Sequence, residues 1–235
     1  MAEWKLKRFW NAATVEQTDD GFAVLLDGRS VKTPAKAGLI VPSKALAEKI
    51  ASEWDAQEGD VNPEIMPFTR AANAAIDKVT LQFVEVADLI AAYGENDLLC
   101  YRAAAPQELV DRQAAAWDPI LDWANDVYGV RLATGQGVMH IAQPPSAIER
   151  LTQEVHALSP FQLTAFYDLV SLTGSLVLGF AIVNNRLGAD AAWDVSRIDE
   201  IWQAEHWGQD EEALDLAETK RQALLSAAEF YANCV

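Results

Sequence analysis

Residues 191–213 hold a dense set of side chains that could carry acid–base or metal chemistry. His206 follows Glu205 directly, and Asp210 lies four residues further on. An imidazole among carboxylates could act as a general base or bind a metal ion, as in a metal-dependent or acid–base hydrolase. However, adjacent helical residues point about 100° apart, and the sequence has no HExxH-type spacing. An ordinary surface histidine in an acidic field is therefore the preferred interpretation.

Other motifs give weaker support to catalysis. Cys100 lies in DLLCYR and could be a nucleophile only if a histidine approached it, so we interpret it as a small core residue. Ser171 and Ser175 lack the context of a nucleophile elbow. Gly135-Gln136-Gly137 has no third glycine, and no GxxxxGK[ST] motif occurs. We therefore expect no catalytic residue, no bound metal and no cofactor.

The same acidic stretch is rich in tryptophan. Trp193, Trp202 and Trp207 lie among seven carboxylates and one arginine, Arg197. If residues 190–206 form one helix, these indoles point to more than one side of it. Two interpretations remain open at this point: a helix packed between two neighbours, or a ledge where aromatic side chains inside an acidic rim meet a partner.

Composition limits the classes of partner. The 235 residues carry a formal net charge of −17, which opposes binding to nucleic acid or to anionic membranes. Two distant cysteines do not indicate a disulfide framework. The apolar run 169–183 is shorter than the roughly 20 residues of a membrane-spanning helix, and we expect a buried helix there. The start, MAEWKLKRFW, resembles neither a signal peptide nor a presequence, so we expect a cytoplasmic protein.

The first part of the chain reads as a small sheet with a covering helix. Residues 21–26 end at Asp27-Gly28, a strong hairpin signal, and residues 14–17 and 38–41 are expected strands beside them. Ser43 is an N-cap candidate for a helix whose residues Leu46, Ile50 and Trp54 share one face. Residues 61–70 contain two prolines and are expected to link this part to the next.

The remainder has helical periodicity. Helices are predicted to start near residues 71, 106, 146, 159 and 211, with a restart at Pro119 and breaks at Gly188 and Gly208. We predict an α+β fold with a small N-terminal domain rich in antiparallel sheet, residues 1–66, and a larger all-helical C-terminal domain, residues 67–235. A hairpin over residues 130–142 could return to the first domain.

Seven segments in order carry a family resemblance. They are RFW, GFAVLLDGRSVKTPAK, LAEKIASEWDAQ, MPFTRAANAAID, YGENDLLCYR, WDPILDWA and DEIWQAEHWGQDEEA. Together they resemble the assembly chaperone of the ATP synthase catalytic head, from about Arg8 to beyond Glu212. The family fold, a small mixed α and β part followed by a helical part, agrees with the prediction above.

The resemblance implies a non-catalytic role. Members bind the unassembled alpha subunit, cover the surface that the beta subunit will occupy, and prevent aggregation. The implied protein is a bacterial cytoplasmic member, with relatives in the mitochondrial matrix. The expected binding residues are Trp202, Glu205, Trp207, Gly208, Asp210 and Glu211. A second charged set, Arg70, Asp97 and Arg102, is expected to form salt bridges between the sheet part and the helices.

Overall fold

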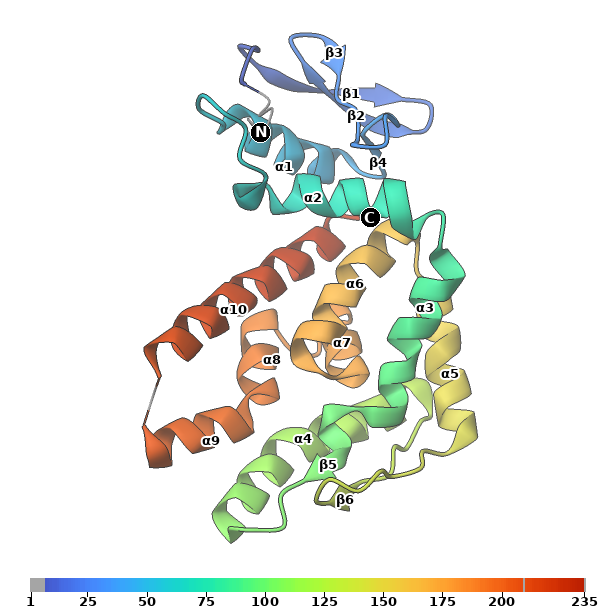
Figure 1. Cartoon of the computed structure of the whole chain (residues 1–235). Helices are drawn as coiled ribbons and strands as arrows, with labels where there is room; N and C mark the ends of the chain where they lie inside the picture. Colours follow the sequence, from blue (N-terminus) through green and yellow to red (C-terminus); the bar gives the residue numbers. More distant parts are fainter. Residues whose placement is uncertain (1–6, 209, 235) are drawn as a thin grey trace. The chain divides into compact units, whose positions relative to one another are not determined.

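The computed structural model describes residues 7–208 and 210–234. They adopt the predicted α+β fold and form two compact units (Figure 1). The first unit holds residues 7–83, 159–165 and 229–234, and the second holds residues 84–158 and 166–228. This division differs from the predicted one, because the first unit continues past residue 66 and includes two later segments.

The first unit contains the expected antiparallel sheet. Strand β1 (Ala13–Thr18) pairs with β2 (Gly21–Leu26), and Val15 lies opposite Val24. Strand β2 also pairs with β3 (Arg29–Ser30) and β4 (Ile40–Val41). Asp27 and Gly28 both have positive φ angles, as a tight hairpin turn requires.

Helix α1 (Lys44–Asp55) covers this sheet. The Ser43 hydroxyl accepts a hydrogen bond from the Leu46 N–H at 3.1 Å, which confirms the predicted N-cap. Leu46, Ile50 and Trp54 are buried in a core that includes Val24. The four-residue spacing therefore sets which face of α1 meets the sheet.

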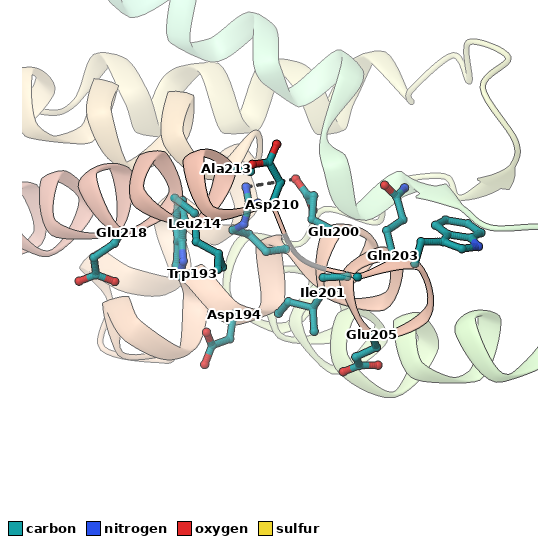
Figure 2. A pocket seen from close by; sticks show the side chains of 15 residues that line it. Trp193, Asp194, Glu200, Ile201, Gln203, Glu205, Asp210, Ala213, Leu214 and Glu218 are labelled. Atoms are coloured by element: carbon teal, nitrogen blue, oxygen red, sulfur yellow. Dashed lines mark ion pairs between the residues drawn. The ribbon is translucent and has the colours of Figure 1, made fainter.

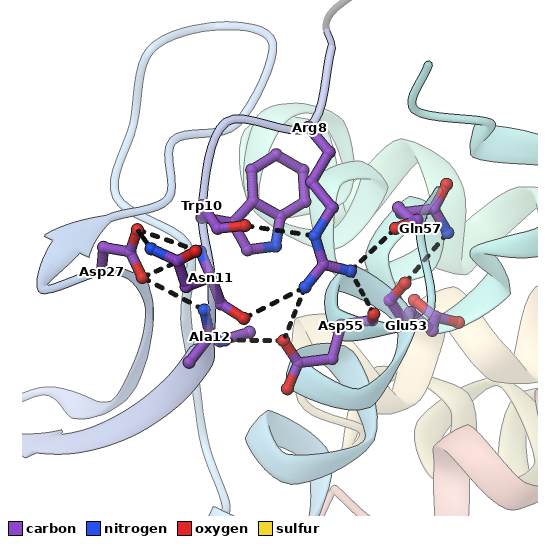
Figure 3. A network of polar contacts seen from close by, with 9 residues as sticks. Arg8, Trp10, Asn11, Ala12, Asp27, Glu53, Asp55 and Gln57 are labelled. Carbon is purple, nitrogen blue, oxygen red and sulfur yellow. Dashed lines mark hydrogen bonds and ion pairs between the residues drawn. The ribbon is translucent and has the colours of Figure 1, made fainter. Parts of the chain in front are cut away.

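Arg8 connects the segment before β1 to the end of α1 (Figure 3). Its guanidinium donates hydrogen bonds to the carbonyls of Asp55 and Gln57 and to that of Asn11. The last carbonyls of a helix lack partners within it, so a cation here satisfies them and suits the helix dipole. This residue belongs to the RFW segment, and its role in this network is structural.

The segment expected to link the two parts, residues 61–70, is partly helical. It contains the 3-10 helix η1 (Pro63–Ile65) and the start of α2 (Pro67–Ala74), which runs into the π-helical η2 (Ala75–Val79). At the start of α2 the Glu53 carboxylate accepts hydrogen bonds from the N–H groups of Phe68 and Thr69, both at 2.7 Å.

Helices dominate the second unit. After residue 83 the helices are α3 (Phe83–Ala91), η3 (Ala92–Asn96), η4 (Leu98–Cys100), α4 (Gln107–Tyr128), α5 (Pro145–His156), α6 (Pro160–Thr173), α7 (Leu176–Val183), α8 (Ala189–Ser196), α9 (Ile198–Trp207) and α10 (Glu211–Ala232). Helix α4 contacts α7 and α9, and α7 also contacts α8. In residues 7–208 and 210–234, no helix is both long and apolar enough to cross a membrane.

Helix α4 continues through Pro119, so the predicted restart there is wrong. The buried stripe of Trp117, Ile120, Leu121 and Ala124 runs across the proline. Packing of this face compensates for the backbone hydrogen bond that proline cannot make. The helix ends at Gly129, which adopts the left-handed conformation with φ of 70°.

The apolar run 169–183 is buried as predicted, but it is not one helix. Gly174 has φ of +70° and ends α6, and the Ser175 hydroxyl caps α7 by accepting from the Leu178 N–H. Further on, Gly179 packs closely: a Cβ there would lie 2.7 Å from Val170 and 3.0 Å from Phe166. Gly174 and Ser175 therefore separate α6 from α7, and Gly179 allows the close packing against Val170 and Phe166.

Residues 130–142 do not form the predicted hairpin. Strand β6 (Gly135–Gln136) pairs in parallel with β5 (Tyr101–Arg102), and both lie in the second unit. The sequence of residues 130–142 is compatible with a local hairpin or with pairing to a distant strand. Only the position of β5 in the folded chain decides between these two pairings.

Candidate docking groove

The acidic aromatic stretch forms two helices and the start of a third. Helices α8 and α9 meet at Arg197, whose φ and ψ of −115° and 20° are not helical. Residues 190–206 therefore do not form one helix, which was the case considered from the sequence. Gly208 follows α9 with φ of +93°, and α10 begins at Glu211 as predicted. The chain therefore changes direction at both ends of α9.

A groove of about 670 Å³ lies along α8, α9 and α10. Its apolar lining includes Ile201 and Ala204 of α9 and Ala213, Leu214 and Ala217 of α10. Acidic side chains surround these residues in Figure 2, where Glu200, Asp210, Glu205, Asp194 and Glu218 spread around Ile201 and Leu214. We call this feature the α9–α10 groove.

The three tryptophans have different environments. Trp193 is 5% exposed and lies under Arg197, whose guanidinium carbon is 5.1 Å from the ring centroid. Trp202 is half-buried and stacks on His206 at 4.2 Å between ring centroids. Trp207 is 80% exposed. The question left open by the sequence therefore has a mixed answer: Trp193 is a core residue and Trp207 faces solvent.

Trp207 also borders a second hollow. This hollow, of about 340 Å³, is lined by Trp202, Leu109 and Val138 among others, and it shares Gln203 and Trp207 with the α9–α10 groove. Val138 and the adjacent Met139 are 96% and 79% exposed. Large apolar side chains in such positions are typical of interaction surfaces.

Ion pairs hold two of the acidic groups in place. Glu205 accepts hydrogen bonds from the Arg112 guanidinium of α4 at 2.7 and 3.2 Å, and this contact lowers the pKa of its carboxyl. Glu200 pairs with Arg197 at 3.2 Å. The Arg112 guanidinium therefore favours the charged form of the Glu205 carboxyl.

Asp210 has a local structural role. Its carboxylate accepts a hydrogen bond from the Glu212 N–H at 3.0 Å and so caps the start of α10. Glu211 is exposed in the first helical turn and lines neither hollow. Of the six expected binding residues, the α9–α10 groove brings together Glu205, Trp207, Gly208 and Asp210. Trp202 lies on the second hollow.

The geometry does not support an acid–base centre at Glu205, His206 and Asp210. Glu205 is bound to Arg112, His206 contacts the Trp202 carbonyl through Nδ1 at 2.8 Å, and Asp210 bonds to the α10 backbone. In residues 7–208 and 210–234, no three His, Cys, Asp or Glu side chains could hold a metal ion. Cys100 is buried, and desolvation raises the pKa of its thiol to about 12, which opposes formation of a nucleophilic thiolate.

The second charged set is not a bridge between the two parts. Asp97 is fully buried and accepts hydrogen bonds from Ser175 Oγ at 2.7 Å and the Val177 N–H at 3.0 Å. Arg102 pairs with Asp118 at 2.8 Å. Asp97, Arg102 and their three partners Ser175, Val177 and Asp118 all lie in the second unit, so the predicted salt bridges between the sheet part and the helices are wrong for Asp97 and Arg102. Arg70 is exposed.

Sequence reasoning missed the apolar lining of the groove. Residues 213, 214, 217 and 218 repeat at spacings of three and four, so one face of α10 carries all four of them. That pattern was available in the sequence, but alanine-rich stripes are common on packed helices. Arg112 was also missed, because its partner Glu205 is 93 residues away.

An open apolar surface with a polar rim is a common feature of surfaces that bind other proteins. The family model described as "ATP12 chaperone protein" matches residues 7–125, and the chain belongs to this family. The protein "atp12, mitochondrial" of Schizosaccharomyces pombe is 25% identical over 241 residues, covering 97% of this chain and 83% of that protein.

Solved structures are similar along the whole chain. The crystal structure of Atp12 from Paracoccus denitrificans is 45% identical, with a TM-score of 0.96 and coverage of 99% of this chain and 100% of that one. A mutant of the same protein, with one aspartate replaced by lysine, is 44% identical with a TM-score of 0.97, and the match covers 100% of both chains.

Proposed function

We propose that this protein is a non-catalytic chaperone for assembly of the ATP synthase catalytic head, and that it binds the free alpha subunit in the bacterial cytoplasm. Family membership and the seven ordered sequence segments support this role. The observation that carries the proposal is the solvent-facing apolar groove bordered by Trp207, inside an acidic rim.

The physical requirements of such a chaperone agree with these features. A free subunit of a ring exposes apolar surface that aggregates readily. A chaperone must cover that surface, remain soluble and release its client. An apolar groove supplies contact area, and a net charge of −17 favours solubility. The proposed contact residues are Trp202, Glu205, Trp207, Gly208, Asp210 and Glu211.

Coexpression tests the proposal. The cognate alpha subunit is produced in cells lacking this chaperone, with the chain supplied or omitted, and soluble alpha subunit is measured after centrifugation. We expect severalfold more soluble subunit when the chain is present, and a complex of the two on size-exclusion chromatography. Equal insolubility in both cultures would refute the proposal.

A further inference from the structure

The facing sides of α9 and α10 lack a covering element in the described chain. On α9 the groove lining includes residues 200, 201 and 204, with 197 just before the helix, and on α10 it includes 213, 214, 217 and 218, with 210 just before the helix. Spacings of three and four are those of a helix face that packs on another helix. Here both faces line one open groove, and Leu214 remains 46% exposed.

The first half of α10 also differs from its second half. Leu216 is 56% exposed in the first half, whereas Leu224 and Ala227 of the second half are buried. An ordinary surface helix turns its apolar residues toward the core along its whole length. The first turns of α10 therefore offer apolar surface that the described parts of the chain leave open to solvent.

The lining favours a helical ligand. Ala204, Ala213 and Ala217 are small, so a guest helix can approach closely between the two walls. Both walls are helices whose backbone groups bond internally, so they offer no sheet edge to an extended peptide. The volume of about 670 Å³ admits several side chains.

The rim favours a basic ligand. Five carboxylates line the groove, those of Asp194, Glu200, Glu205, Asp210 and Glu218, against the single guanidinium of Arg197. Arg112 and Arg221, outside the lining, pair with Glu205 and Glu218. Among the residues that the structure describes, neither Asp194 nor Asp210 has an ion-pair partner. These two carboxylates can meet cations of a partner.

We propose that the α9–α10 groove binds one amphipathic helical segment of the client, with an apolar stripe flanked by Lys or Arg. This inference rests on the proposed function only for the identity of the client. Apolar contacts with Ile201 and Leu214 supply the buried area, and the rim selects the sign of the flanking charge. A second copy of this chain, with its net charge of −17, is a poor occupant.

A peptide-binding experiment tests the groove directly. The probe is a fluorescein-labelled helical peptide of about 15 residues, with a leucine stripe and lysine flanks. A second peptide carries glutamate in place of every lysine. Fluorescence anisotropy with the full chain is expected to show binding of the lysine peptide and about tenfold or weaker binding of the glutamate peptide. Equal affinity for both, or no binding of either, would overturn the proposal.

Two variants with matched controls locate the binding. Ala213→Trp fills the groove, and Ala223→Trp places the same side chain at an exposed position of α10 outside it. Asp194→Lys reverses a rim charge, and Asp126→Lys does so at an exposed position of α4 away from the groove. We expect Ala213→Trp and Asp194→Lys to weaken lysine-peptide binding about tenfold, and the controls to change it less than twofold. Melting temperatures verify that each variant folds.

Repeating the coexpression with Ala213→Trp separates this inference from the proposed function. If the wild-type chain keeps the alpha subunit soluble and Ala213→Trp does so equally well, the groove is not the contact. This inference and the proposed contacts in the groove then fail, and the chaperone role stands. If the wild type does not protect the alpha subunit but binds the lysine peptide in the groove, the proposed function fails and the groove assignment stands.

Discussion

Asp97 shows how one buried carboxylate joins two segments of the helical unit. Its oxygens accept hydrogen bonds from the Leu99 and Val177 N–H groups, both at 3.0 Å, and from the Ser175 hydroxyl at 2.7 Å. Burial raises the pKa of this carboxyl, because desolvation opposes its charge more strongly than the hydrogen bonds favour it. The residue positions η4 against the start of α7.

Replacing Asp97 is therefore expected to destabilise the fold. Asp97→Ala leaves three buried donors without an acceptor and should lower the free energy of unfolding by about 3 kcal/mol. Asp97→Asn keeps one acceptor oxygen and carries no buried charge, so its loss should be about 1 kcal/mol. Urea denaturation of both variants measures the difference. Equal stability of the alanine variant and the wild type would contradict the assigned role.

Residue-scale reasoning from sequence alone succeeded where the interaction is local. The Ser43 hydroxyl bonds to the N–H of Leu46, only three residues further along the chain, so the local sequence predicts this cap. Asp97 accepts hydrogen bonds from Ser175 and Val177, which lie 78 and 80 positions further along the chain. The residues next to Asp97 in the sequence do not identify these partners. The salt bridge predicted for Asp97 was wrong because a buried carboxylate can also be satisfied by neutral donors, here a hydroxyl and backbone N–H groups.

At the scale of the element, α4 contains a local conflict. Pro119 has no N–H to bond to the carbonyl of residue 115, yet the helix runs from Gln107 to Tyr128. The side chain of Pro119 is exposed, whereas the stripe of Trp117 and Ile120 is buried. Tertiary packing on one side of α4 thus outweighs the unfavourable proline on the other.

Pro119→Ala should stabilise the protein. It allows the missing backbone hydrogen bond and removes the steric clash, with an expected gain of about 1–3 kcal/mol in the free energy of unfolding. Asn125→Ala, at another exposed position of α4, is the control for general helix propensity and should gain less than about 0.7 kcal/mol. A less stable Pro119→Ala protein would show that the proline geometry itself is needed for packing.

At the scale of the whole molecule, acidity and the groove act together. With 35 acidic and 18 basic residues, the chain has a net negative charge, and the rim of the groove places carboxylates around apolar surface. Long-range charge sets the rate of encounter and apolar contact sets the lifetime of the complex. We therefore expect capture of the alpha subunit to slow as ionic strength rises.

Asp210 and Glu211 allow this charge effect to be separated from helix capping. Asp210→Asn keeps an acceptor for the Glu212 N–H, whereas Asp210→Lys removes it and should cost about 1 kcal/mol of stability. Glu211→Lys leaves that hydrogen bond intact. Both lysine variants should weaken chaperoning more than Asp210→Asn does. This difference should be larger at low salt than at high salt, because salt screens the charges. Association rates with the alpha subunit, measured at two ionic strengths, test this; unchanged rates and unchanged rescue would contradict it.

The amino-acid sequence by itself determined the hairpin at Asp27-Gly28, the capped helix α1, the start of α10 and the family. These features depend on turn residues, caps, periodicity and ordered motifs, each of which lies within a few neighbouring residues. Tertiary structure alone decided the break between α8 and α9, the parallel pairing of β5 with β6, and the exposure of Trp207 beside a buried Trp193. Each of these depends on which distant segment covers a given face, and no local pattern specifies that segment. The acidic aromatic stretch is therefore neither all core nor all surface: one end of it packs inward, and the other borders the groove.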